Sequence, residues 1–310
     1  MMRDLRSFGS LRRLPGIFML LVGVIALVVA GCSNDDNDTA TLGADISPTN
    51  VQVAKNEAIA ALLPENVRSS GELKVGVNVP YSPNEFKDSS GNIIGFDVDL
   101  MNAVTKVLGL KPQYIEAQFD KIIPSIVAGT YDVGMSSFTV NPERLQQVDF
   151  VSYFSAGIQW AQRTGEAIDP NNACGKKVAV QSHTVEADTE LPAKSKACTD
   201  AGKDAIEIVK FDSQDQATNA LLLSKVDAMS ADSPVTAYAI ARSNGKLALA
   251  GGVAESEPYG WAVQKGSSLG PAMQKALQYL IDNGQYKAIA EHWTVQAGMI
   301  QTPVINPPVS

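Results

Sequence analysis

Short hydrophobic segments follow one another through most of the chain, and their spacing switches between that of strands and that of helices. Residues 73–77 alternate apolar and polar positions in the manner of a β-strand. Between 97 and 108 the apolar side chains recur at helical spacing, and Gly109 is placed to end that helix. The unit repeats, because a helical face over 119–127 precedes a predicted strand at 132–135.

The later part of the chain shows the same alternation. Strands are predicted at 177–180 and 206–211, and helices at 216–224 and 272–283. Alternating strands and helices are typical of α/β domains with mostly parallel sheets. Small ligands bind such sheets at the carboxyl ends of the strands. The sequence therefore predicts an α/β fold with a ligand site at strand ends, followed by an irregular tail after Gly298.

The first 31 residues have the composition of an export signal. A segment with four arginines precedes an apolar run over 17–29, which is shorter than the roughly 20 residues of a spanning helix. The Ala30-Gly31-Cys32 sequence resembles the bacterial lipobox, in which the cysteine is acylated after the signal is removed. We therefore expect a lipoprotein signal peptide at 1–31 and a lipid anchor on Cys32. An ordinary signal peptide or short anchor with an incidental cysteine is the alternative.

A lead-in follows the cysteine and covers residues 32–70. Its first part, 33–50, is polar and acidic with no hydrophobic period, which indicates a flexible tether. Together with the acylated cysteine, this segment predicts a protein that is held on the extracytoplasmic side of the cell membrane.

Composition excludes several classes of function. The chain of 310 residues is 45% hydrophobic and 19% charged, which excludes disorder of the whole chain and suits one large or two medium domains. The formal net charge of −8 argues against nucleic acid as a partner. Three cysteines and two histidines show no metal-ligand spacing, and there is no phosphate loop, dinucleotide fingerprint or nucleophile motif. We expect no metal and no cofactor.

Export also bears on the remaining cysteines. With Cys32 acylated, Cys174 and Cys198 are left as a pair in an oxidising compartment, where disulfides persist. A bond between them closes a loop of about 25 residues and stabilises the fold by roughly 3.5 kcal/mol in the chain-entropy model. Two buried free thiols are the alternative.

Six ordered blocks of sequence resemble the periplasmic amino-acid-binding proteins of ABC importers, solute-binding protein family 3. The blocks are Pro80–Pro83 with Gly95–Leu100, Phe119–Pro124, Tyr131–Thr139, Pro142–Arg144, Val178–Thr184 and Val226–Asp232. The resemblance implies the two-lobe type II periplasmic-binding-protein fold, in which two lobes with mostly parallel sheets and flanking helices are joined by two crossing strands. It places lobe 1 at 71–158 and 263–300, lobe 2 at 159–262, and an irregular tail at 301–310.

The resemblance also implies a site for an α-amino acid. Arg144 would bind the carboxylate, because its planar guanidinium can hold both oxygens, and backbone N–H groups of Thr139 and Thr184 would complete that cradle. Asp232 would bind the ammonium group. The alternatives are a surface ion pair for Arg144, with Glu143 or Asp149, and a helix N-cap for Asp232.

Further residues of these blocks would surround the ligand. Tyr81 and Phe119 match the aromatic walls of the family, although plain core packing is the alternative for both. Ser136 and Ser137 would add polar contacts, as would the Thr139 side chain.

Two departures from the family bear on the ligand. Members that bind lysine, arginine or ornithine tend to carry an acid where this chain has Asn78, so the sequence favours a neutral, amide or acidic ligand side chain over a basic one. His183 replaces the usual small residue beside the carboxylate loop. It either contacts an anionic ligand side chain or faces solvent.

The sequence thus predicts a monomeric receptor, not an enzyme, that captures a polar amino acid by hinge closure and delivers it to an ABC permease. A sensing module and a binder of an unusual amino-acid-like compound such as an opine are the alternatives. A dehydratase on the same fold is a third, for which Glu186 is the one candidate general acid among the cleft blocks.

Overall fold

The computed structural model describes residues 47–309. The predicted signal peptide, Cys32 and the tether up to residue 46 lie outside the described residues. Within 47–309, none of the helices combines the length and the apolar character needed to span a bilayer. The described end of the tether contacts the fold, because the Thr49 amide donates to the Asp99 carboxylate over 2.7 Å.

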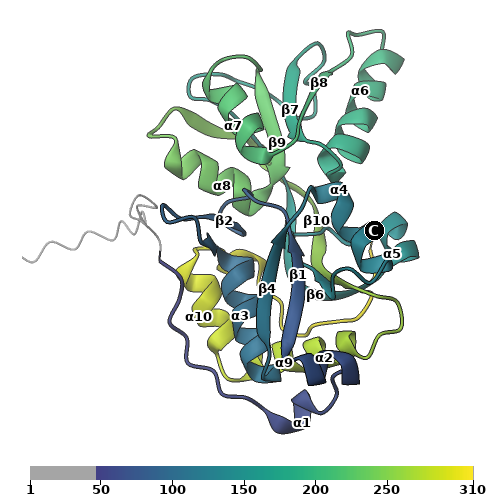
Figure 1. Cartoon of the computed structure of the whole chain (residues 1–310). Helices are drawn as coiled ribbons and strands as arrows, with labels where there is room; N and C mark the ends of the chain where they lie inside the picture. Colours follow the sequence, from purple (N-terminus) through teal and green to yellow (C-terminus); the bar gives the residue numbers. More distant parts are fainter. Residues whose placement is uncertain (1–46, 310) are drawn as a thin grey trace, which may run out of the picture. The chain divides into compact units, whose positions relative to one another are not determined.

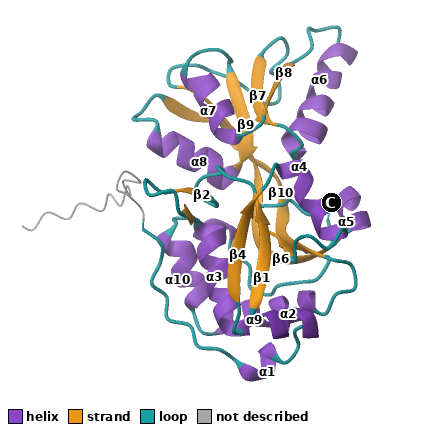
Figure 2. Cartoon of the chain, viewed as in Figure 1, coloured by secondary structure: helices purple, strands orange, loops and turns teal. Residues whose placement is uncertain are grey.

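One large sheet organises the fold (Figure 2). Two long strands, β6 (Asp149–Arg163) and β10 (Leu247–Val263), pair antiparallel at its centre. A first half on the β10 side and a second half on the β6 side each have mainly parallel pairing. The first half is β4 (Lys111–Glu116), β1 (Glu72–Val77) and β5 (Val133–Gly134), and the second is β9 (Ala228–Asp232), β7 (Lys177–Gln181) and β8 (Glu207–Phe211).

Helices flank both halves of the sheet (Figure 1). The first half carries α1 (Glu57–Ala60), α2 (Glu65–Ser70), α3 (Phe96–Leu108), α4 (Phe119–Val127), α5 (Pro142–Gln147), α9 (Leu269–Asp282) and α10 (Gln285–His292). The second half carries the π-helix η1 (Glu186–Glu190), α6 (Leu191–Asp200), α7 (Gln214–Leu222) and α8 (Ser233–Arg242). A hairpin of β2 (Phe86–Lys87) and β3 (Ile93–Ile94) and a 3₁₀ turn, η2 (Gln296–Gly298), complete the elements.

The strands and helices predicted from periodicity are present, and the α/β fold class is confirmed. Helix α3 shows why, because its apolar face is buried against α9 and the sheet and Gly109 ends it in the left-handed conformation. The tail after Gly298 is irregular, as predicted, but Asn306 fixes it to β6 through the Phe150 backbone. The lobe boundaries at 71–158, 159–262, 263–300 and 301–310 stay a prediction.

Cys174 and Cys198 form the predicted disulfide, with their Cα atoms 5.5 Å apart. Cys174 precedes β7 and Cys198 lies in α6, so the bond ties this helix to the segment that leads into β7. Cys198 is buried in the small core of that half. The alternative of two free thiols does not hold in this structure.

Gly95 is the residue at which the turn after β3 meets helix α3. Its φ of 140° lies in a region that residues with a side chain rarely adopt. A Cβ atom here would lie 2.1 Å from the backbone oxygen of Asn84. The same Asn84 carbonyl accepts a hydrogen bond from the Asp97 amide, so Gly95 allows two backbone segments to touch.

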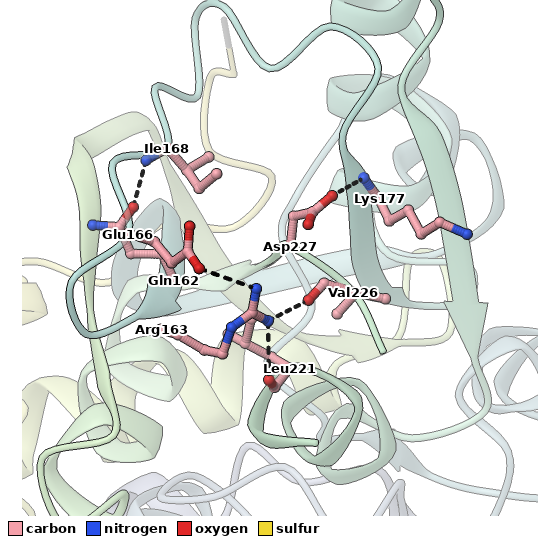
Figure 3. Close-up of polar contacts among 8 residues, drawn as sticks. All are labelled: Gln162, Arg163, Glu166, Ile168, Lys177, Leu221, Val226 and Asp227. Atoms are coloured by element: carbon pink, nitrogen blue, oxygen red, sulfur yellow. Dashed lines mark hydrogen bonds and ion pairs between the residues drawn. The ribbon is translucent and has the colours of Figure 1, made fainter. Parts of the chain in front are cut away.

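Arg163, the last residue of β6, connects three segments of the second half (Figure 3). Its Nη1 donates to the carbonyls of Val226 and Leu221, over 2.5 and 3.4 Å, and its Nη2 lies 3.6 Å from the Glu166 carboxylate. Leu221 is in the last turn of α7, and its carbonyl also accepts from the Ser224 amide, so the guanidinium adds a second donor there and its shorter bond is to Val226.

We expect Arg163→Met to lower the free energy of unfolding by about 2 kcal/mol, because it removes a charged donor from the half-buried Val226 carbonyl and the tie between these segments. Urea denaturation measures this loss. Arg68→Met is the matched control, since exposed Arg68 pairs only with Glu65 in its own helix and should change stability by less than about 0.5 kcal/mol. Equal effects of the two substitutions would contradict the role given to Arg163.

Candidate functional site

One cavity brings together nine of the ten residues that the sequence places at the ligand. They are Asn78, Tyr81, Phe119, Ser136, Ser137, Thr139, Arg144, Thr184 and Asp232. Gln181, Val185 and Glu186 complete the lining. His183 does not line this cavity; its side chain is exposed, so of its two alternatives the structure has the solvent-facing one.

The ends of four strands position these side chains. Asn78 directly follows β1, and Ser136 comes two residues after β5. From the second half, Gln181 is the last residue of β7 and Asp232 the last of β9. Because these are the carboxyl ends of parallel strands, their side chains meet at one edge, as the α/β pattern predicts.

Arg144 lies in α5, which begins after Asn141 caps it. Its Nη1 donates to the Thr139 carbonyl over 2.7 Å and its Nη2 to the His183 carbonyl over 3.2 Å. The guanidinium also lies 5.3 Å from the ring centre of Phe119. These contacts differ from the surface ion pair that was the alternative. They leave further N–H donors of the guanidinium for a ligand carboxylate.

Asp232 lines the cavity from the second half of the sheet, at the end of β9, and is 8% exposed. Burial raises the pKa of its carboxyl group, while the hydrogen bond from Tyr81 and the charge of Arg144 lower it. The residue stands at the N-terminus of α8, but its side chain makes no capping hydrogen bond. The carboxylate therefore faces the cavity rather than serving as the predicted alternative, a helix cap.

Three hydrogen bonds cross the cavity and link the two halves. The Tyr81 hydroxyl donates to Asp232 over 2.7 Å, and the Gln181 amide donates to the Asn78 side-chain oxygen over 2.8 Å. The third is the bond from Arg144 to the His183 carbonyl. Asn78 also donates to a backbone carbonyl, so both ends of its side chain have partners in the protein.

Two buried acids, Glu85 and Asp97, support the cavity floor, and the sequence reasoning did not find them. Glu85 accepts from the hydroxyls of Ser136 and Ser137, and Asp97 accepts from the Ser137 backbone amide over 3.3 Å and from the Tyr153 hydroxyl over 2.6 Å. Burial raises the pKa of Asp97 to about 6, and burial with the neighbouring charge raises the pKa of Glu85 further from its usual range. Burial therefore favours the protonated form of both acids.

Comparisons with known proteins agree with this geometry. Residues 73–296 match the family of bacterial extracellular solute-binding proteins, family 3. An arginine-binding protein of Corynebacterium glutamicum is 42% identical over 250 residues, which are 80% of this chain and 82% of that protein. An L-arginine-binding protein of Pseudomonas aeruginosa is 29% identical over 232 residues, which are 71% of this chain and 87% of that protein.

A solved structure adds the fold. An ancestral arginine-binding protein bound to arginine matches with a TM-score of 0.65 and 36% identity, over 72% of this chain and 98% of that one. This likeness confirms the predicted type II periplasmic-binding-protein fold.

Proposed function

The chain belongs to the bacterial extracellular solute-binding proteins, family 3, and from this premise we propose that it captures an α-amino acid with a cationic side chain, of the arginine type, for an ABC importer. Its relatives are solute-binding proteins and not enzymes, which agrees with the expectation from sequence. These relatives therefore give no support to the alternative that the chain is a dehydratase.

The observation that carries the proposal is the placement of opposite charges in one cavity. Arg144 and Asp232 stand on its two sides, and an α-amino acid presents a carboxylate and an ammonium group that match them. Tyr81 and Phe119 line the space between as aromatic surfaces. A ligand that touches both halves favours their closed arrangement, because it adds contacts that only this arrangement offers.

The choice of an arginine-type ligand corrects the expectation drawn from Asn78. Both relatives and the solved structure described above are named for arginine binding, which runs against a neutral or acidic side chain. The expectation rested on one position alone. In the structure the Asn78 side chain is already held by Gln181 and the Ala117 carbonyl, so its neutrality says little about the ligand.

Membrane anchoring through Cys32 and a monomeric receptor complete the proposal. The support for the anchor is the lipobox-like sequence at residues 30–32, and that for extracytoplasmic placement is the family itself. The disulfide between Cys174 and Cys198 agrees with an oxidising compartment.

Calorimetric titration with L-arginine, L-lysine, L-histidine, L-glutamine and L-glutamate tests the proposal. The protein is first unfolded and refolded to remove any ligand that copurifies. We expect L-arginine to bind with a Kd of about 1 μM or below and L-glutamate to bind at least about tenfold more weakly. A protein that prefers L-glutamate, or that binds none of the five, would not be an arginine-type receptor.

A further inference from the structure

The cavity holds one more acid than a zwitterion can use. Its charged lining residues are Arg144, Asp232 and Glu186. An α-amino acid engages the first two through its carboxylate and ammonium groups, and Glu186 is then left over. With Glu186 ionised, the charges in the closed site balance only when the ligand itself carries a net charge of one positive unit.

The Glu186 side chain is buried and, within residues 47–309, has an oxygen atom without a hydrogen-bond partner. It is 3% exposed, and its Oε1 atom has no hydrogen-bond partner among the described residues. A buried polar atom without a partner is costly, so proteins seldom keep one without a use. The charged and titratable groups around it are Arg144 of α5, Asp232 at the end of β9, Tyr81 after β1 and Glu190 in its own helix.

A second, acidic cavity adjoins the first and shares Glu186 with it. Glu143, Glu255 and Glu257 also line this adjoining cavity, and its described lining includes no lysine or arginine. The carboxylates around Glu186 therefore produce a negative potential on this side of the ligand space. A cation gains from that potential, whereas a neutral amide does not.

We propose that the Glu186 carboxylate binds the side-chain cation of the ligand and so sets the preference of the site for cationic over neutral amino acids. This inference rests on the proposed function and names the residue behind its specificity. Glu186 thus takes the role of the acid that meets a cationic ligand side chain, which the chain lacks at Asn78.

Binding of a cationic ligand should then release a proton from Glu186. Burial, and next the charge of Asp232, raise the pKa of Glu186 to about 8, so the empty site holds this carboxyl group mostly protonated at pH 7. A cation at hydrogen-bond distance favours the ionised form and lowers that pKa. The ligand should therefore displace a proton when it carries a side-chain cation, and should displace none when it is neutral.

L-arginine and L-citrulline form the test pair, because citrulline has a neutral urea group in place of the guanidinium at nearly the same shape. We expect the parent protein to bind arginine about 10- to 100-fold more tightly than citrulline. In Glu186→Gln this ratio should fall to about threefold or less, with citrulline affinity retained. Asp188→Asn is the matched control, because it removes an exposed acid of the same helix that pairs with Lys210, and its ratio should equal that of the parent.

Titrations at pH 7 in buffers of different ionisation enthalpy count the protons released. The parent should release a large part of one proton with arginine and none with citrulline, and Glu186→Gln should release none with either. This measurement on the parent also decides the question if Glu186→Gln fails to fold. An undiminished arginine preference in Glu186→Gln, or no proton release by the parent, overturns the role of Glu186 and leaves the proposed function standing. Absence of binding by every amino acid overturns the proposed function instead.

Discussion

Asp232→Asn is expected to raise the Kd for the amino acid by about 30- to 4000-fold, with the fold intact. The ligand ammonium group would lie in a buried site without its counter-charge, and loss of one partner of such a pair costs about 2–5 kcal/mol. Asparagine keeps the shape of the side chain and can still accept a hydrogen bond from Tyr81, so the loss reports the charge rather than a collapsed cavity.

Calorimetry with L-arginine measures the change, and circular dichroism checks the fold. Asp200→Asn is the control, because Asp200 is exposed on α6, pairs with Lys196 and does not line the cavity. The control should bind as the parent does. Affinity of Asp232→Asn within threefold of the parent would place the ammonium group elsewhere.

Gly95→Ala should have the largest effect on stability. Backbone strain at this φ and the contact with the Asn84 carbonyl each contribute about 1–3 kcal/mol, so the free energy of unfolding should fall by roughly 2–6 kcal/mol. The atoms nearest to the added Cβ belong to the backbone of Asn84 and Glu85, so no flexible side chain can move away. Because Glu85 and Asp97 flank this contact and hold Ser136 and Ser137, we also expect weaker ligand binding.

Urea denaturation and calorimetry measure these two effects. Gly129→Ala separates the causes, since Gly129 also has a positive φ of 72° but has open space where the Cβ would lie. Its cost should be only the strain of a left-handed residue, about 1–2 kcal/mol. If both substitutions cost the same, the contact with Asn84 contributes nothing.

Local patterns predict the elements whose burial is regular along the chain. Strand β1 and helix α3 are examples, because the first four residues of β1 alternate exposed and buried and the apolar residues of α3 recur at helical spacing. Periodicity did not predict β10, whose sequence mixes a buried end with an exposed middle around Gly251 and Gly252 and whose pairing with β6 shifts register three times. Its course depends on the partner strand, which no local pattern contains.

The residues of the site likewise differ in how far the sequence predicts them. Arg144 and Asp232 could be identified because they lie in sequence blocks of the family. Glu85 and Asp97 could not, because two acids twelve positions apart come together only through the turn at Gly95, and burial there raises the pKa of both. The ligand preference taken from Asn78 runs against the arginine-binding relatives for a related reason, since the charge of a cavity depends on all of its walls.

The bonds from Tyr81 to Asp232 and from Arg144 to two carbonyls also matter for unloading. When cargo leaves, a bare carboxylate and a bare guanidinium in a dry cleft would hold it back or draw in another ion. Here a hydroxyl and two carbonyls are at hand to take over each charge. Separation of the two halves would break the Tyr81–Asp232 and Arg144–His183 bonds, so opening costs contacts within the protein as well as those of the ligand, whereas the bond from Arg144 to Thr139 lies within the first half and stays.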